Sequence, residues 1–140
     1  MAEIEYHLIT ADNASLLDHI ETGVYDAPIK ADFLAASLAN PHQILVVAVA
    51  NDVVVGKAQA YVFYFPEKPA EIYIEEIDVA KKWRRQGVAS ALMDAVGAEG
   101  KKRGIVEYWL ITEKDNDGAR ALYERTAHKE QKSVWYEFYC

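Results

Sequence analysis

The stretch that decides the fold is EIYIEEIDVAKKWRRQGVASALMDAV, residues 71–96. Its first part is rich in β-branched and aromatic side chains and predicts a strand over 71–79. The apolar spacing then changes, because Val88, Leu92 and Val96 recur at the helical interval. Two arginines precede this helix, although the helix dipole already places partial positive charge at an N-terminus. An anion bound there would explain them, since free N–H groups, the dipole and two guanidinium groups would converge on it.

The same patterns extend outward from this strand and helix. Further strands are predicted over residues 4–10, 43–50, 53–65, 105–112 and 132–139, with a short one near 128–130, and further helices over 11–23, 26–41 and 116–125. A strand–helix–strand unit requires a parallel strand pair, whereas the hairpin over 43–65 is antiparallel. The sequence therefore predicts an α/β (α+β) fold, in which helices cover both faces of one mixed sheet.

Composition limits the class of protein. A chain of 140 residues with 51% hydrophobic residues suits a single domain over 1–140. The formal charge of −7 argues against a nucleic-acid partner and favours cationic ones. No stretch approaches the length of a membrane span, and the first ten residues do not resemble a signal peptide. With Cys140 as the only cysteine, we expect a cytoplasmic protein without disulfides or membrane partners.

The loop before the helix is suited to a pyrophosphate. Arg84, Arg85 and Gln86 are side-chain donors, and Gly87 would let a ligand approach the bare backbone. The loop lacks both GxxxxGK[ST] and GxGxxG, so it is neither nucleotide-binding loop. It matches R-x-x-G-x-A, ending at Ala89.

Together with a second motif, this loop resembles the Gcn5-related N-acetyltransferase (GNAT) family. The second motif is N-x-x-A-x-x-L-Y, with Asn116, Ala119, Leu122 and Tyr123. The resemblance implies acetyl-coenzyme A as cosubstrate, no metal, and a mostly antiparallel sheet with a splayed parallel pair at its centre. Residues 53–92 are similar to the middle of aminoglycoside 3-N-acetyltransferases, through G-x-x-x-A-Y-V and E-I-Y-I.

The resemblance also implies where the cosubstrate lies. Ile77, Asp78 and Val79 would pair with the pantetheine arm through their backbone, and the N–H of Ile77 would donate to the thioester oxygen. Asn116 caps its helix and adjoins the cosubstrate. The pyrophosphate would be surrounded by the loop and the first helical turn, namely Arg84, Arg85, Gln86, Gly87, Val88, Ala89 and Ser90.

Acetyl transfer to an amine needs a base and an acid. An alkylammonium group is protonated at neutral pH, so a carboxylate is useful for removing its proton. Strand 71–79 offers Glu75 and Glu76, and strand alternation does not decide between them because the family carries a bulge there. We favour Glu76, where the aminoglycoside enzymes have an acidic residue; Glu75, His128 and water remain alternatives. Tyr123 is the candidate acid for the departing thiolate, since the pKa values of a phenol and a thiol are comparable.

These observations predict an acetyl-coenzyme A-dependent N-acetyltransferase. The expected acceptor is a primary amine of a small cationic molecule, with an aminoglycoside as the example. A protein or peptide amine is an alternative acceptor, and a non-catalytic coenzyme A-binding module is an alternative function. The turn after Tyr123 departs from the family, because YERTAHKE lacks the usual glycine. The resemblance also implies a homodimer that pairs through the terminal strands, and the aromatic stretch KSVWYEFY, residues 132–139, would serve for this contact.

Overall fold

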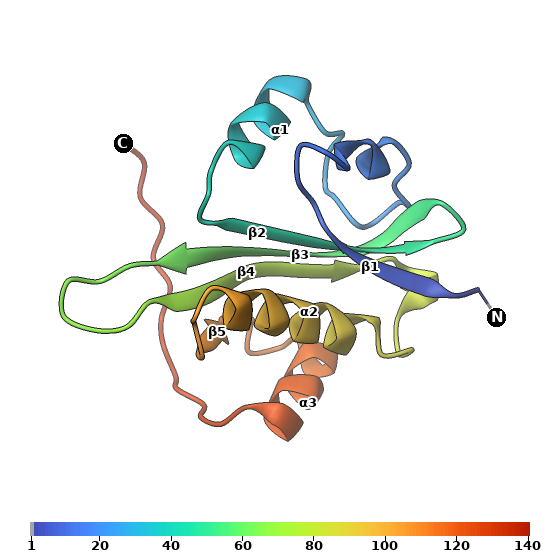
Figure 1. The fold of residues 1–140 in the computed structure, drawn as a ribbon. Helices are drawn as coiled ribbons and strands as arrows, with labels where there is room; N and C mark the ends of the chain where they lie inside the picture. The colour runs from blue at the N-terminus through green and yellow to red at the C-terminus, as the bar shows by residue number, and fades with distance from the viewer. Residues whose placement is uncertain (1) are drawn as a thin grey trace.

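The computed structural model describes residues 2–140, which form one five-stranded sheet with the strand order β1-β2-β3-β4-β5 (Figure 1). The first four strands run antiparallel to their neighbours, and β4 and β5 are parallel. This arrangement confirms the predicted mixed α/β sheet. The strands are β1 Ile4–Leu8, β2 Gln43–Ala50, β3 Val53–Phe63, β4 Glu71–Val79 and β5 Tyr108–Leu110.

The hairpin between β2 and β3 forms as predicted because its turn suits two strands of right-handed twist. Asn51 and Asp52 have φ angles of 52° and 63°, and Ala50 pairs directly with Val53. Two consecutive residues with positive φ make a type I′ turn, which asparagine and aspartate tolerate. On its other edge β3 pairs with β4, and this pairing brings distant residues into the site described below.

Helices cover both faces of the sheet, as predicted. The longest, α2 Val88–Lys102, packs Val88, Leu92 and Val96 against Ile72 and Ile74 of β4. On the other face lie the 3₁₀ helix η1 Ala14–Asp18 and the helix α1 Ala31–Leu38 (Figure 1). The remaining elements are the short 3₁₀ helix η2 Lys81–Trp83 and the helix α3 Asp117–Thr126, which lies on the α2 side.

Two predicted helices are shorter than expected. The helix over 11–23 is reduced to η1, because the Asn13 side chain accepts a hydrogen bond from the Thr10 N–H and donates one to the Leu8 carbonyl. Such local side-chain bonds offer the backbone an alternative to a helix. The helix over 26–41 starts only at Ala31, after the proline at position 28. Both segments still cover the second face of the sheet.

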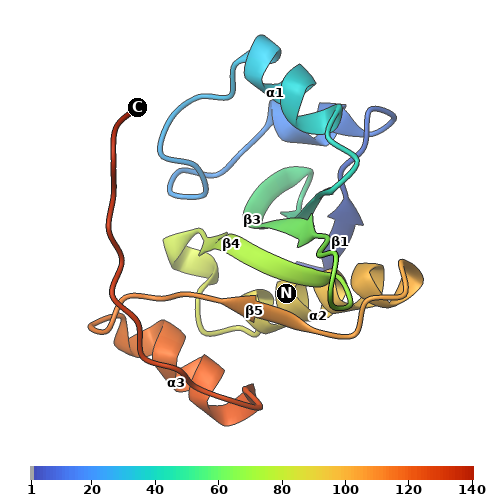
Figure 2. The ribbon, with the colours of Figure 1, turned by 90° about the vertical axis from the view of Figure 1, so that its left-hand side faces the viewer.

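The predicted strands after α3 do not form. Residues 127–140 contain no helix or strand in the described chain, so the predictions for 128–130 and 132–139 are wrong (Figure 2). A strand needs a partner edge along its length, and β5 has only three residues. As a result, the parallel β4–β5 pair lies at one edge of the described sheet and not at its centre.

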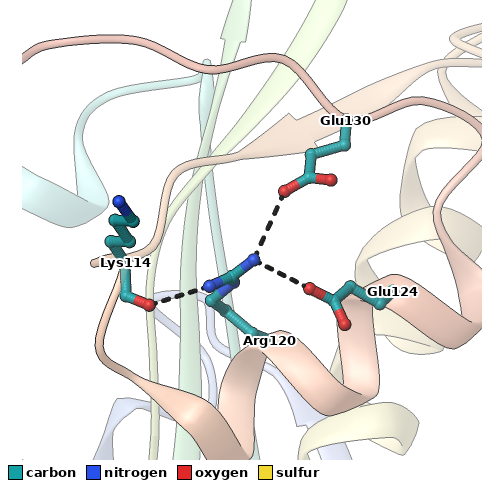
Figure 3. A network of polar contacts seen from close by, with 4 residues as sticks. All are labelled: Lys114, Arg120, Glu124 and Glu130. Atoms are coloured by element: carbon teal, nitrogen blue, oxygen red, sulfur yellow. Dashed lines mark hydrogen bonds and ion pairs between the residues drawn. The ribbon is translucent and has the colours of Figure 1, made fainter.

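An arginine in α3 fixes this helix to the chain on either side of it. Arg120 donates to the Lys114 carbonyl at 3.0 Å and to Glu124 at 3.0 Å, and it lies 3.6 Å from Glu130 (Figure 3). The helix also begins with a cap, because Asn116 Oδ1 accepts the Ala119 N–H at 3.2 Å. These contacts hold in place the helix that carries Tyr123.

Candidate active site

The parallel pair is splayed, and this leaves part of β4 open. Only Ile72–Ile74 of β4 pairs with β5. Further along, the Ala80 N–H donates to Val55 of β3 at 2.9 Å, so alternation turns the backbone of Ile77 and Val79 away from β3. Consistent with this, the Val79 carbonyl accepts the Arg84 Nε at 2.9 Å. The N–H groups of Ile77 and Val79 therefore face the open side, where an extended ligand can be added as a strand.

The backbone of Asp78 has the opposite orientation. By the same alternation, its N–H and carbonyl face β3, opposite Lys57. Of the three residues that we expected to pair with pantetheine, Ile77 and Val79 present their backbone to the open side. Asp78 presents its carboxyl group to the site instead.

A β-bulge determines which face of β4 carries its acidic residues. The register with β3 shifts between Gln59 and Ala60, so Gln59 pairs with Glu76 whereas Ala60 pairs with Ile74. As a result, Ile74 and Ile77 both contact the core under α2. Glu76 and Asp78 lie together on the other face, within reach of Lys57. The bulge therefore turns both carboxylates away from the core under α2 and places them beside the open stretch of β4.

Between these carboxylates lies a lysine that sequence analysis missed. Lys57 of β3 is 3% exposed, and its Nζ lies 2.8 Å from Glu76 Oε2 and 3.4 Å from Asp78 Oδ2. The ring of Tyr25, from the loop before α1, covers the same ammonium group at 4.1 Å. We call Tyr25, Lys57, Glu76 and Asp78 the acidic cluster. The one sequence signal was a single lysine within the otherwise apolar run VVVGKAQA.

The two carboxylates of the acidic cluster titrate differently. Burial raises the pKa of Glu76, but the hydrogen bonds from Lys57 and Asp78 and the charge of Lys57 outweigh it, so the net pKa lies below the usual value. For Asp78, burial, the hydrogen bond with Glu76 and the charge of Glu76 together raise the pKa to about 6, despite the opposing effect of Lys57. At neutral pH Glu76 is therefore a carboxylate with a free lone pair.

Glu75 and His128, the alternative bases, lie in different surroundings. Glu75 is exposed on the bulge; burial and the charge of Glu76 raise its pKa, and Lys57 opposes them. His128 is exposed in the segment after α3. The lysine contact distinguishes Glu76 from both.

Tyr123 lies on the inner face of α3. Its ring is partly buried and packs with Leu122 against the core under α2. Burial and then the negative charge of Asp78 raise the pKa of its phenol. The phenol therefore carries its proton at neutral pH, as a proton donor requires.

The loop before α2 leaves backbone N–H groups without helical partners. Arg85 and Gly87 have φ angles of 60° and 80°, and the first helical bond joins the Ala91 N–H to the Gly87 carbonyl at 3.0 Å. The N–H groups over 88–90 precede this bond and are left for a ligand. A Cβ atom at Gly87 would meet nothing within 4 Å, so the space above this backbone is open.

Two of the predicted loop donors also have local partners. The hydrogen bond from Arg84 to the Val79 carbonyl ties the loop to the end of β4, and Gln86 Nε2 donates to the Lys82 carbonyl at 3.0 Å. Arg85 projects from the loop as an exposed residue. Arg85 is thus the side chain best placed to meet a phosphate.

Aromatic rings lie beside the acids on the strands. Tyr73 stacks on Trp109 of β5 with 4.5 Å between the ring centroids, and on Phe63 of β3 with 6.2 Å. The charge of Glu75 contributes to the raised pKa of Tyr73, after burial. Flat rings next to carboxylates suit a cationic ligand with apolar edges.

The rest of the described chain holds a hollow but no metal-binding group and no membrane helix. A shallow hollow of about 510 Å³ lies between η1 and α1, and alanine and leucine side chains line it. Residues 2–140 hold no group of three His, Cys, Asp or Glu side chains placed for a metal ion. None of the helices described is both long and apolar enough for a membrane crossing.

Comparison with known proteins agrees with this geometry. The profile of the acetyltransferase (GNAT) family matches residues 11–128, and the chain belongs to this family of acyltransferases. The resemblance seen in the two motifs is thereby confirmed.

Individual relatives cover different shares of the chain. Over 67 residues it is 37% identical to N-alpha-acetyltransferase 30 of Schizosaccharomyces pombe, a match that spans 48% of this chain and 44% of that relative. A solved aminoglycoside acetyltransferase, HMB0005, from an uncultured soil metagenomic sample, is 22% identical, with a TM-score of 0.84 and 99% of each chain covered. The aminoglycoside N-acetyltransferase AAC(6')-Iy, solved with coenzyme A, is 21% identical, with a TM-score of 0.78 over 100% of this chain and 97% of the other. At these identities the two structures establish a shared fold.

Proposed function

We propose that the protein transfers an acetyl group from acetyl-coenzyme A to a primary amine of a small cationic acceptor, with an aminoglycoside as the leading candidate. One observation carries this proposal: Glu76, paired with Lys57 at 2.8 Å, lies beside the stretch of β4 that the splay leaves open. Membership of the GNAT family and the fold shared with aminoglycoside acetyltransferases support it.

The residues of the open edge suit the pantetheine arm and its thioester. Ile77 and Val79 offer backbone groups to the arm, and the Ile77 N–H donates to the thioester oxygen as it gains negative charge. Arg85, Gly87 and the N–H groups over 88–90 hold the pyrophosphate. Acetyl-coenzyme A supplies the activated acyl group.

Side chains around this edge carry out the proton transfers of the reaction. Glu76, directly or through one water, accepts a proton from the acceptor ammonium, so that the free amine attacks the carbonyl carbon. As the C–S bond breaks, Tyr123 donates its phenol proton to the sulfur of the departing thiolate, and its phenolate is reprotonated by the second proton that the nitrogen loses, directly or through water. The rings of Phe63, Tyr73 and Trp109 offer the acceptor a cation-binding surface.

Coenzyme A affinity should depend on the loop before α2. Gly87→Val forces a β-branched residue into a left-handed conformation and fills the open space, so coenzyme A binding should weaken at least about tenfold. Arg85→Asn keeps a residue type that tolerates a φ of 60° but removes charge-assisted hydrogen bonds of about 1.5–3 kcal/mol. That loss corresponds to roughly 10- to 100-fold in Kd, which calorimetry measures.

The matched control is Lys101→Ala, which removes one positive charge at the other end of α2. It should leave the affinity within about twofold, because a distant surface charge contributes little. Unchanged coenzyme A binding in both loop variants would place the pyrophosphate elsewhere.

A protein or peptide amine is the second candidate acceptor, and the match to an N-alpha-acetyltransferase favours it. Thiol release from acetyl-coenzyme A, measured with aminoglycosides, polyamines and peptide amines, separates the candidates. Turnover with aminoglycosides supports the first, and turnover with peptides alone supports the second. Coenzyme A binding without any turnover would favour a non-catalytic binding module.

The proposal includes a cytoplasmic homodimer. Trp135 and Phe138 are 79% and 86% exposed in the segment after α3, and β5 has an open edge among the described residues. Exposed apolar groups on this scale are unusual for a monomer. We propose that residues 132–139 of two copies pack against each other, so that their exposed aromatic groups become buried in the dimer. The free thiol of Cys140 suits the reducing cytoplasm.

Oligomeric state tests the homodimer directly. Analytical ultracentrifugation should give a dimer for the wild type and a monomer for Trp135→Asp/Phe138→Asp, because burying unpaired charged side chains in an apolar interface is costly. The control, Tyr64→Asp, alters another exposed aromatic residue and should remain dimeric. A wild-type monomer at tens of micromolar protein would contradict the proposal.

A further inference from the structure

Lys57 is the one charged side chain that is buried among the described residues. It lies in β3, and its neighbours Val55 and Ala58 belong to the apolar core. Burying an ammonium group is costly, and a buried ion pair is often no more stabilising than apolar residues of the same volume. Fold stability alone therefore gives a weak reason for a lysine at this position.

The two carboxylates give a stronger reason. Glu76 and Asp78 are two residues apart on one face of β4, and both contact the Lys57 ammonium. Without a cation, two neighbouring carboxylates in a half-buried site do not both ionise near neutral pH, so one would retain a proton. Lys57 supplies the positive charge between them.

The Tyr25 ring strengthens the interaction of Lys57 with the two carboxylates. The Tyr25 ring covers the ammonium with its centroid at 4.1 Å, and the same ammonium donates a hydrogen bond to Glu76 and forms an ion pair with Asp78. Coulomb interactions strengthen when water is excluded, so a covered lysine acts on the carboxylates more than an exposed one. The pKa of Lys57 itself is raised, because its contacts with Glu76, Asp78 and Tyr25 outweigh the lowering effect of burial.

We propose that Lys57 is a positioning residue for acetyl transfer: it holds Glu76 ionised and oriented beside the open edge of β4, while Tyr25 shields the pair from water. This inference rests on the proposed function, in which Glu76 accepts the proton of the acceptor amine. The other titratable groups that face this set are Glu75 and Asp78 on β4, Tyr25 in the loop before α1 and Tyr123 on α3.

The test is Lys57→Met, which keeps the volume and removes the charge. With no cation the carboxyl groups hold their protons to higher pH, so the acidic limb of kcat/KM should move up by about one pH unit or more. Activity should fall roughly tenfold near pH 6 and recover toward pH 9. A merely structural role would lower the rate equally at every pH, and that result would overturn the proposal.

Lys68→Met is the matched control. Lys68 pairs with Glu71 at the start of β4, with 3.1 Å between the charged atoms, but it is exposed and outside the acidic cluster. Its removal should leave the pH profile in place. An equal shift in both variants would mean that overall charge, and not the Lys57 contact, sets the profile.

A second readout does not require turnover. Carboxyl-carbon NMR should show Glu76 titrating at higher pH in Lys57→Met than in the wild type. In Glu76→Gln, where Lys57 is retained, Asp78 should titrate well below its wild-type pKa of about 6, because it loses the neighbouring charge and keeps the cation.

If the wild type acetylates no amine, the proposed function fails, and these titrations still decide the charge role of Lys57. An unchanged Glu76 titration in Lys57→Met would overturn that role, and Lys57→Gln takes the place of this variant if Lys57→Met does not fold.

Discussion

Replacing Tyr123 by phenylalanine should lower the acetyl-transfer rate by roughly 10²-fold, the range expected for loss of a general acid. The substitution removes one hydroxyl group and keeps the ring that packs with Leu122 on the core. Coenzyme A affinity and the free energy of unfolding should therefore change by less than about 1.5 kcal/mol, the net value of one hydrogen bond. Single-turnover kinetics and calorimetry on the same preparation separate the two effects.

Tyr108→Phe is the control for this experiment. Tyr108 lies in β5 and, like Tyr123, has a pKa raised by burial, but it is not assigned a role in proton transfer. Its rate should stay within about threefold of the wild type. If Tyr123→Phe retains full activity, the thiolate takes its proton from water or another residue, and our assignment of the acid is wrong.

Replacing Glu76 by glutamine should have the second large effect, a rate loss of about 10²-fold or more at neutral pH. The variant keeps the shape of the side chain and its place on the bulge. As pH rises, the acceptor amine loses its proton without help, so the variant should recover part of the rate at pH 9 to 10. The wild type should vary less over this range, because its Glu76 pKa lies below the usual value.

Glu71→Gln, at the other end of β4, provides the comparison. Its side chain pairs with Lys68 and lies outside the acidic cluster. It should show the wild-type pH profile. If Glu76→Gln also keeps the wild-type profile, the role passes to Glu75, His128 or bulk water.

Most of the sheet could be predicted because its signals are local. The hairpin over 43–63 and the strand 71–79 follow from β-branched runs and from the Asn51–Asp52 turn. The start of α2 follows from a change in apolar period and from a glycine that adopts a φ of 80°. These features depend on neighbours in the sequence.

What sequence reasoning missed depends on distant partners. Lys57 becomes part of the site only because β3 pairs with β4 and because Tyr25 folds over its ammonium group. The strand expected over 132–139 has the right alternation, but no partner edge of sufficient length exists within the described chain. Alternation reports which face of a segment is apolar, and it does not report whether an edge is available.

The bulge in β4 is a further feature that the periodicity of the sequence does not predict. Strict alternation would place Glu76 on the same face as Ile74, whereas the register shift at Gln59 puts it with Asp78 on the opposite face. Local sequence does not specify one extra residue in a strand. The resemblance to the GNAT family, and not periodicity, indicated that a bulge was to be expected there.

The most direct test of the central claim is mass spectrometry of an aminoglycoside after incubation with acetyl-coenzyme A. We predict a mono-acetylated amine with the wild type and a product yield at least about 10²-fold lower with Glu76→Gln/Tyr123→Phe, under conditions where both proteins bind coenzyme A. Wild-type protein that binds coenzyme A but yields no acetylated amine would contradict the account. So would a double variant that forms the product as fast as the wild type.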